Sequence, residues 1–176
     1  MDGSQKAQFE IYRLYYKSMY NSSLRIVGVP EEAEDIMQDS FLTAFRKLNK
    51  YNGEVSFGSW LKKIVINRSL DTLRKRKVLF EELHAELPVV DERESEVEPI
   101  TVAEVKTAIN QLSDGYRTIL SLILFEGYDH EEVSEILGIK NVTSRTQFSR
   151  ARQKLRDILT ENKKRQMKEG IYGYLG

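Results

Sequence analysis

The stretch that decides the fold runs from Tyr128 to Leu159 and reads YDHEEVSEILGIKNVTSRTQFSRARQKLRDIL. Asp129 followed by Glu132 has the spacing of a capping box, which favours the start of a helix. Gly138 stands where a helix commonly ends on a left-handed residue. A second helix is predicted to begin near Asn141, which is a good capping residue. The stretch therefore predicts two short helices joined by a tight turn.

The second of these helices has two different faces. Apolar residues recur on one side at helical spacing, and they are Phe148, Ala151, Leu155 and Leu159. Polar residues recur on the opposite side, and they are Arg145, Ser149, Arg152 and Arg156. A helix that packs on one side and carries arginines on the other is suited to a DNA major groove, with base contacts near its start and phosphate contacts later. The alternative is a helical hairpin whose arginines are only solvated.

Charge lies in three blocks along a chain whose 27 basic and 27 acidic residues cancel. Residues 40–77 hold ten basic and two acidic residues, a net charge of +8. Residues 81–98 hold eight acidic residues and one arginine, a net charge of −7, and residues 145–168 have a net charge of +7. Two basic blocks on either side of an acidic one indicate two separate contacts with nucleic acid. Chance clustering in a chain that is 31% charged is the alternative.

The composition argues against several kinds of site. The chain has no cysteine, which excludes disulfides, thiolate catalysis and cysteine-based zinc sites. Its two histidines, His84 and His130, are far apart in the sequence, so no metal site and no cofactor are predicted. The sequence contains no phosphate-binding loop or nucleophile elbow, and the protein is expected not to be an enzyme. Because it has no signal peptide and no long apolar run, a soluble, cytoplasmic protein is expected.

The acidic block divides the chain into two parts. Residues 78–98 have neither a helical nor a strand period, and a loop of about twenty residues is unusual inside one compact domain. We therefore predict an all-α protein with two small helical domains, residues 1–77 and 99–162, joined by an acidic linker. Residues 163–176 form a basic and then glycine- and tyrosine-rich tail. Residues 170–176 show no helical pattern, and the tail is expected to be mobile.

Helical periodicity is visible in both domains. The helices predicted for the first domain cover residues 9–26, 31–50 and 57–76. The helices predicted for the second domain, before the helix-turn-helix, cover residues 101–112 and 116–126.

One face of the helix predicted at residues 57–76 combines an indole, an ammonium group and an amide. Trp60, Lys63 and Asn67 fall on this face at helical spacing. Single-stranded DNA is bound by an aromatic surface on which a base stacks, together with positive charge for its backbone. The adjoining loop of residues 51–57 could complete a pocket for an unstacked base. Alternatively, Trp60 is a core residue of a small helical domain.

The helix predicted at residues 31–50 has an acidic start and a mixed face. The helix dipole alone explains its first acidic residues but not Asp39. One face contains an acid, an amide and an apolar centre, formed by Asp35, Gln38, Leu42 and Phe45. Such a face suits docking to another protein.

These motifs together resemble a known family. Residues 33–41 (AEDIMQDSF) resemble the core-binding helix of bacterial sigma factors. Residues 57–67 (FGSWLKKIVIN) and 71–74 (DTLR) are similar to their −10-recognition and promoter-melting helix. Residues 127–156 are similar to their −35-recognition helix-turn-helix. The order of the motifs and the acidic linker match the small extracytoplasmic-function (ECF) type, and the match covers nearly the whole chain.

The resemblance implies core RNA polymerase, promoter DNA (duplex and single-stranded) and an anti-sigma factor as partners, with a monomer when free. The residues implied for core polymerase binding are Asp35, Gln38, Asp39, Leu42 and Phe45. Those implied for −10 recognition and melting are Tyr51, Asn52, Phe57, Trp60, Lys63, Asn67, Arg68 and Arg74. Those implied for −35 recognition are Arg145, Thr146, Ser149, Arg150, Arg152 and Arg156.

The chain departs from the family pattern at the start of the recognition helix. Residues 142–144 read Val-Thr-Ser where the family often has Gly-Thr-Val, and Gln147 replaces a common arginine. These differences concern the −35 sequence that is recognised and not the mode of binding. Two other hypotheses remain open: a helix-turn-helix regulator with a helical partner-binding domain, which would usually dimerise, and a helical interaction module without a DNA role.

Overall fold

The computed structural model describes residues 5–76 and 100–173, and these residues form helices and no strand. The chain divides into two compact units, Met1–Glu81 and Glu82–Gly176. The predicted all-α fold class is therefore confirmed. The acidic linker predicted at residues 78–98 lies outside the described residues.

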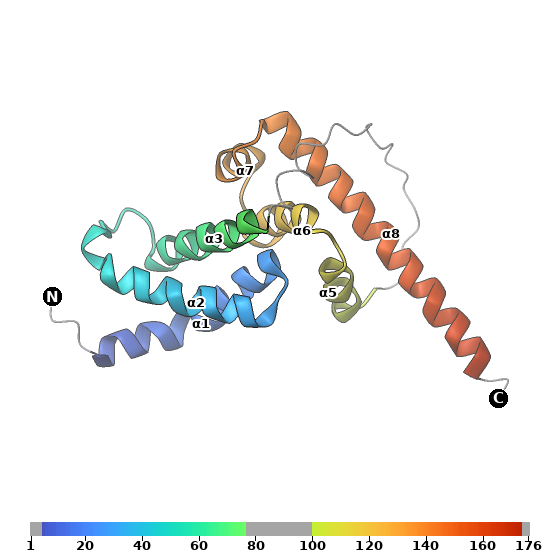
Figure 1. Ribbon diagram of the computed structural model, residues 1–176, viewed down its shortest axis with the longest axis horizontal. Coiled ribbons are helices and arrows are strands. Elements are labelled where there is room, and N and C mark those ends of the chain that lie inside the picture. The colour runs from blue at the N-terminus through green and yellow to red at the C-terminus, as the bar shows by residue number, and fades with distance from the viewer. Residues whose placement is uncertain (1–4, 77–99, 174–176) are drawn as a thin grey trace. The chain divides into compact units, whose positions relative to one another are not determined.

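The first unit is a bundle of three helices that all pack on one another (Figure 1). They are α1 (Gln5–Val27), α2 (Pro30–Arg46) and α3 (Phe57–Lys75), with a short 3-10 helix η1 (Leu48–Lys50) after α2. Pro30 opens α2, where its fixed φ and missing N–H are tolerated. The side chain of Ser56 caps α3 by accepting a hydrogen bond from the backbone N–H of Ser59.

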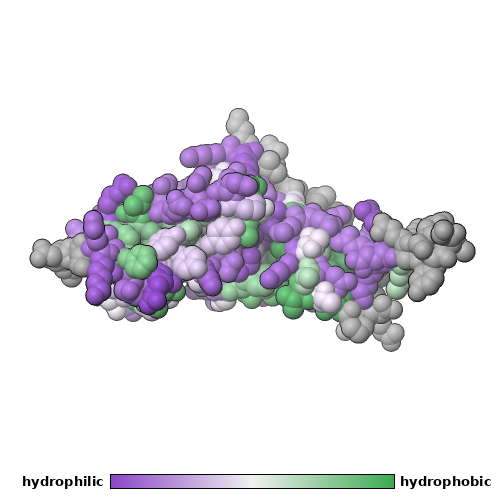
Figure 2. All heavy atoms as spheres, turned by 90° about the horizontal axis from the view of Figure 1, so that it is seen from below, coloured by the Kyte–Doolittle hydropathy of each residue, from purple (hydrophilic) through white to green (hydrophobic). Residues whose placement is uncertain are grey.

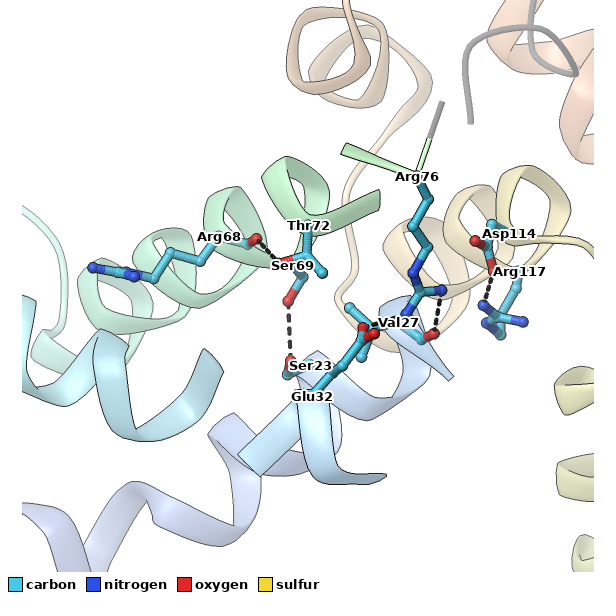
Figure 3. Close-up of polar contacts among 9 residues, drawn as sticks. All are labelled: Ser23, Val27, Glu32, Arg68, Ser69, Thr72, Arg76, Asp114 and Arg117. Atoms are coloured by element: carbon cyan, nitrogen blue, oxygen red, sulfur yellow. Dashed lines mark hydrogen bonds and ion pairs between the residues drawn. The ribbon is translucent and has the colours of Figure 1, made fainter. Parts of the chain in front are cut away.

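Apolar side chains from the three helices form the core of this unit. Fully buried residues include Met19, Ile26, Phe41, Leu61, Val65 and Leu73. The small side chains of Ser23 and Ser69 let α1 and α3 approach closely, and their hydroxyls share a buried hydrogen bond of 3.1 Å. Figure 3 shows the Ser23–Ser69 pair; Ser69 also donates to the backbone oxygen of Val65 at 2.9 Å, so the buried hydroxyls are satisfied.

Arg76, just after α3, ties the ends of all three helices together (Figure 3). Its Nη1 donates to the backbone oxygen of Val27 at 3.3 Å, at the end of α1. Its Nη2 forms an ion pair with the carboxylate of Glu32 in the first turn of α2. Only 28% of the Arg76 side chain is exposed, so solvent screens this pair less than a surface pair.

We expect Arg76→Ala to lower the free energy of unfolding of the first unit by about 1–2 kcal/mol, because two partly buried charge-assisted contacts are lost. Urea unfolding followed by far-UV circular dichroism measures the change. Arg74→Ala is the matched control, because Arg74 pairs with Asp71 on the exposed surface at 2.8 Å. Equal losses for the two variants would contradict a special role for Arg76.

The second unit is built along one long helix, α8 (Asn141–Gly173) (Figure 1). Three shorter α-helices pack against it: α5 (Val102–Asn110), α6 (Asp114–Leu120) and α7 (His130–Leu137). A short π-helix, η2 (Ser121–Phe125), follows α6 directly. The predicted helix at residues 116–126 therefore starts two residues earlier and changes from α to π geometry. The buried Arg117 and the half-buried Asp114 form an ion pair at the start of α6 (Figure 3).

The prediction that residues 170–176 lack helical structure is wrong for residues 170–173, which belong to α8. A helix that has already formed extends at little cost, and the residues after 160 are rich in good helix formers. Earlier turns of α8 pack on α5, and Leu159 and Asn162 line a groove of about 350 Å³ together with Ala103 and Thr107 of α5. Residues 174–176 lie outside the described residues.

Hydrophilic side chains cover most of the face drawn in Figure 2, with hydrophobic ones between them in small areas. This agrees with the mean hydropathy of −0.48. Within the described ranges, no helix has both the length and the apolar character needed to cross a bilayer.

Candidate nucleic-acid interface

The turn between α7 and α8 lies where the sequence predicts it, after a helix with a capped start and a left-handed glycine at its end. The side chain of Asp129 accepts hydrogen bonds from the backbone N–H groups of Glu131 (2.8 Å) and Glu132 (2.9 Å). The Glu132 carboxylate in turn accepts from the backbone N–H of Asp129 at 2.9 Å, which completes the capping box. Gly138 ends α7 with φ 69° and ψ 33°, a left-handed conformation that favours glycine. The predicted capping box and left-handed glycine are confirmed.

The start of α8 differs from the prediction in one detail. Asn141 is the first residue of the helix rather than its cap. The backbone oxygen of Lys140 accepts the first helical hydrogen bond, from Ser144, at 3.0 Å. The side-chain oxygen of Asn141 instead accepts from Nε of Arg145 at 2.9 Å, so Asn141 helps to orient that guanidinium.

The predicted polar face of α8 is present. Arg145 and Arg152 are exposed, while Thr146, Ser149 and Arg156 are half-buried. The guanidinium carbon of Arg152 lies 5.9 Å from the ring centroid of Phe148. We call the group Arg145, Ser149, Arg152 and Arg156 the arginine face.

Arg150 does not lie on the arginine face. Only 8% of Arg150 is exposed, and Gln147 is 1% exposed. Arg150 follows Arg145 by five residues, which rotates it by about 140° around the helix, toward the packed side. We therefore remove Arg150 from the DNA surface and assign it, with Gln147, to packing. The spacing of five residues between Arg145 and Arg150 is the sequence signal for this position.

His130 is a member of this region that the sequence analysis did not identify. It is the first residue of α7, and its Nδ1 lies 3.0 Å from Oγ of Ser144 in α8. Its ring packs edge-on against Phe148, with 5.5 Å between the ring centroids. His130 thus joins the two helices of the motif. Burial, and next the charge of Arg145, lower the pKa of His130 below its ordinary value.

We expect the second unit to lose stability on acidification because of His130. A lowered pKa means that the unfolded chain binds the proton more tightly, so the contribution is complete above about pH 6.5 and is lost as the pH falls through the lower folded value. Thermal unfolding of the wild type and His130→Asn between pH 8 and pH 5 measures this. The variant should show a weaker pH dependence, and His84→Asn should not. Identical profiles for wild type and His130→Asn would contradict the assignment.

The first unit carries three aromatic rings around the start of α3. The ring centroids of Tyr51 and Trp60 are 5.4 Å apart, those of Phe57 and Trp60 5.6 Å, and those of Tyr51 and Phe57 5.7 Å. We call these three residues the aromatic cluster. All three are half-buried. Trp60 is therefore neither sealed in the core nor fully exposed, and it combines the two alternatives of the sequence analysis.

The loop before α3 is held by its own hydrogen bonds. Tyr51 Oη donates to the backbone oxygen of Val55 at 2.7 Å. The side-chain oxygen of Asn52 accepts from the backbone N–H of Glu54 at 3.2 Å, across Gly53, whose φ is 78°. The loop therefore presents the Tyr51 ring to Trp60 in a defined position.

The other predicted −10 residues follow along α3. Lys63 and Asn67 are exposed, and Arg74 is exposed and paired with Asp71. Arg68 is half-buried, and its guanidinium donates to Asp39 Oδ2 at 3.0 Å and to Thr43 Oγ1 at 2.6 Å. A residue predicted to contact DNA is therefore paired with one predicted to contact polymerase.

The predicted polymerase-binding face lies on α2. Asp35, Gln38, Asp39 and Leu42 are exposed and Phe45 is half-buried. Leu42 is 51% exposed, an apolar side chain among polar neighbours. A groove of about 700 Å³ runs between α2 and α3, lined on one side by Asp35 and Asp39 and on the other by Asn67 and Arg68. The described residues contain no group of acidic or histidine side chains that could hold a metal ion.

Comparison with known proteins identifies the family to which this chain belongs. Residues 11–78 match the sigma-70 region 2 family and residues 103–155 match the sigma-70 region 4 family. The chain is 30% identical over 168 residues to the RNA polymerase sigma factor NccH of Alcaligenes xylosoxydans, a match that covers 89% of each chain. The chain belongs to the sigma-70 family of RNA polymerase sigma factors.

Two further relatives are ECF sigma factors, and the chain is of this type. The chain is 28% identical to the ECF sigma factor SigW of Bacillus subtilis, over 90% of this chain and 92% of that protein. It is 30% identical to the ECF sigma factor SigE of Mycolicibacterium smegmatis, of which it spans only 62%.

Solved structures agree with the fold of this sigma factor. The sigma factor RpoE of Bartonella quintana, crystallised with the anti-sigma factor NepR, superposes with a TM-score of 0.59 at 23% identity and covers 88% of this chain. CnrH, solved with the cytosolic domain of CnrY, superposes with a TM-score of 0.53 at 22% identity over 90% of this chain. The region 2 match, residues 11–78, includes both the aromatic cluster and the α2 face predicted to bind polymerase.

Proposed function

We propose that this sigma factor binds core RNA polymerase and directs it to promoters by contacting the −35 duplex with α8 and the melted −10 strand with α3. The single observation that carries the proposal is the arginine face, with Arg145 and Arg152 exposed, on the second helix of a helix-turn-helix. Arg145 lies near the start of α8, where a recognition helix contacts base edges. Arg152 and Arg156 follow at the spacing expected for phosphate contacts.

The −10 strand would be held by the aromatic cluster and the polar residues beside it. A half-buried ring offers one face to a base while its other side packs on the protein, and each base–aromatic contact is worth about 1–3 kcal/mol. The exposed amide of Asn67 would hydrogen-bond a base edge, and Lys63 and Arg74 would contact the backbone. Trapping an unstacked base in this way would offset the cost of opening the duplex.

Core polymerase would bind the exposed face of α2. Leu42 supplies an apolar centre, and Asp35, Gln38 and Asp39 supply a polar rim, the anatomy of a protein interface. The two units would then be held at the correct spacing by polymerase, so the free protein would bind promoters weakly. The affinity for DNA would fall steeply with salt because arginines and lysines replace counterions on phosphates.

The chain would act by binding alone, as a cytoplasmic monomer without a cofactor and without a catalytic step of its own. An anti-sigma factor would regulate this sigma factor, as suggested by the RpoE structure, which contains the anti-sigma factor NepR. Residues 81–98 have a net charge of −7, which would be attracted to basic surfaces of the transcription complex.

Run-off transcription tests the proposal. Core polymerase is incubated with a genomic promoter library, with and without this protein, at several salt concentrations. We expect promoter-selective products only when the protein is present. Their absence at every salt concentration would contradict the proposal, and a stable dimer in sedimentation would favour the helix-turn-helix regulator.

A further inference from the structure

We propose that Gly58 and Tyr15 position the aromatic cluster for strand binding, although neither residue belongs to it. Tyr15 lies on α1, far from the cluster in the sequence, and Gly58 is the second residue of α3. The inference rests on the proposed binding of the −10 strand and adds two positioning residues to it.

The first step is the close approach of α1 and α3 at Gly58. A Cβ atom added to Gly58 would lie 2.8 Å from Cε1 of Tyr15, 3.5 Å from Cδ1 and 3.6 Å from Cζ. A separation of 2.8 Å is well below the ordinary contact distance between carbon atoms. Gly58 has helical backbone geometry, so its role here is space and not a left-handed conformation. Glycine stabilises a helix less than alanine does, so the close contact at Gly58 is made at the cost of a lower helix propensity.

The second step is that the Tyr15 ring has a neighbour in the direction of the cluster. Tyr15 is half-buried, and its ring centroid lies 5.7 Å from that of Phe57 with an interplanar angle of 53°. A tyrosine ring is rigid, so the clash must be relieved by moving the whole ring or the helix. Packed side chains transmit such a displacement because interiors contain few voids.

The third step links Phe57 to the surface proposed to hold DNA. Phe57 meets Tyr51 edge-on at an interplanar angle of 90°, and it meets Trp60 at 51°. A displaced Phe57 would therefore change the positions of both rings on which a base could stack. Gly58 and Tyr15 act through these rings and not through contact with the strand.

The experiment combines two readouts in a double-mutant cycle. The variants are Gly58→Ala, Tyr15→Ala, Tyr15→Phe, and Gly58→Ala combined with each tyrosine variant. The first readout is the fluorescence of Trp60, which is the single tryptophan of the chain. The second is promoter opening by the reconstituted holoenzyme, measured as permanganate reactivity of −10 thymines on a promoter from the run-off screen. Urea unfolding of each variant measures global stability.

We expect Gly58→Ala to shift the Trp60 emission and to reduce promoter opening about tenfold, the size of one lost base–aromatic contact. In the Tyr15→Ala background, where the opposing ring is absent, Gly58→Ala should have no further effect on either readout. In the Tyr15→Phe background, which retains the ring, the full effect of Gly58→Ala should persist. Such coupling between two positions is the signature of a direct interaction.

The possible failures are distinguishable. Unchanged emission and opening in Gly58→Ala would overturn the inference, as would equal losses in the Tyr15→Ala and Tyr15→Phe backgrounds. A loss of opening that only follows a loss of unfolding free energy would also overturn it, by showing a structural role alone. If the wild type opens no promoter while the emission shows the predicted coupling, the proposed function fails and the steric positioning stands.

Discussion

Arg145→Ala is expected to reduce discrimination at the −35 element roughly 5- to 150-fold while core polymerase binding stays unchanged. The guanidinium is exposed near the start of α8 and is oriented by Asn141 at 2.9 Å, so its loss removes a base-reading group without opening the core. A well-placed contact to a base edge contributes about 1–3 kcal/mol of discrimination, which sets this range. The measurement compares transcription from a promoter and from versions with single −35 substitutions.

Arg165→Ala is the matched control for this prediction. Arg165 is an equally long cation on the same helix, with 70% of its side chain exposed. It lies twenty residues beyond Arg145, about 30 Å further along the helix. It should leave −35 discrimination intact. If both variants lose discrimination equally, general positive charge and not the position of Arg145 is responsible.

The second large effect is expected at the polymerase interface, where Asp39→Arg should weaken core binding by about a hundredfold or more. Inverting a charge at an interface places like charges together and costs several kcal/mol. Binding of the labelled variant to core polymerase measures the loss. Asp39 lies in the first unit, so this measurement does not depend on −35 binding by the second unit. Glu31→Arg makes the same change of charge at an exposed position in the first turn of α2 and should have a small effect.

The structure requires one more variant here, because Asp39 pairs with Arg68 within the chain at 3.0 Å. Asp39→Arg would place two cations together and could act by disturbing α3. The charge-swapped double variant Asp39→Arg, Arg68→Asp restores an internal ion pair. If polymerase binding remains weak in the double variant, Asp39 contacts polymerase directly. If binding recovers, the internal pair accounts for the loss, and our assignment of Asp39 to the interface is wrong.

Local features of this chain could be predicted from the sequence. The capping box of α7 and the left-handed Gly138 each depend on residues within one or two helical turns. The same is true of Pro30 at the start of α2. Their energetics are set by backbone hydrogen bonds and dihedral preferences, which neighbours in the sequence determine. The positions of these helix ends therefore followed from local sequence signals.

The assignment of Arg150 shows where a motif misleads. Arginine suits DNA binding, but the angular position of Arg150 on α8 turns its side chain toward the packed side of the helix. Only 8% of Arg150 is therefore exposed. The tail shows the opposite error. Residues 170–173 lack an apolar pattern, yet they extend a helix whose preceding turns already pack on α5.

The sequence by itself determined where the described helices lie, the capping box of α7 and the two basic charge blocks along the chain. Only the tertiary structure decided that Asp39 meets Arg68, that His130 reaches Ser144, and that Tyr15 lies against Gly58. These pairs are 14 to 43 residues apart and lie on different helices, and the buried hydroxyl pair Ser23 with Ser69 spans 46 residues. Caps and periodicity act over a few residues, whereas contacts between helices depend on how each helix is rotated and how closely it packs, which the folded bundle alone sets.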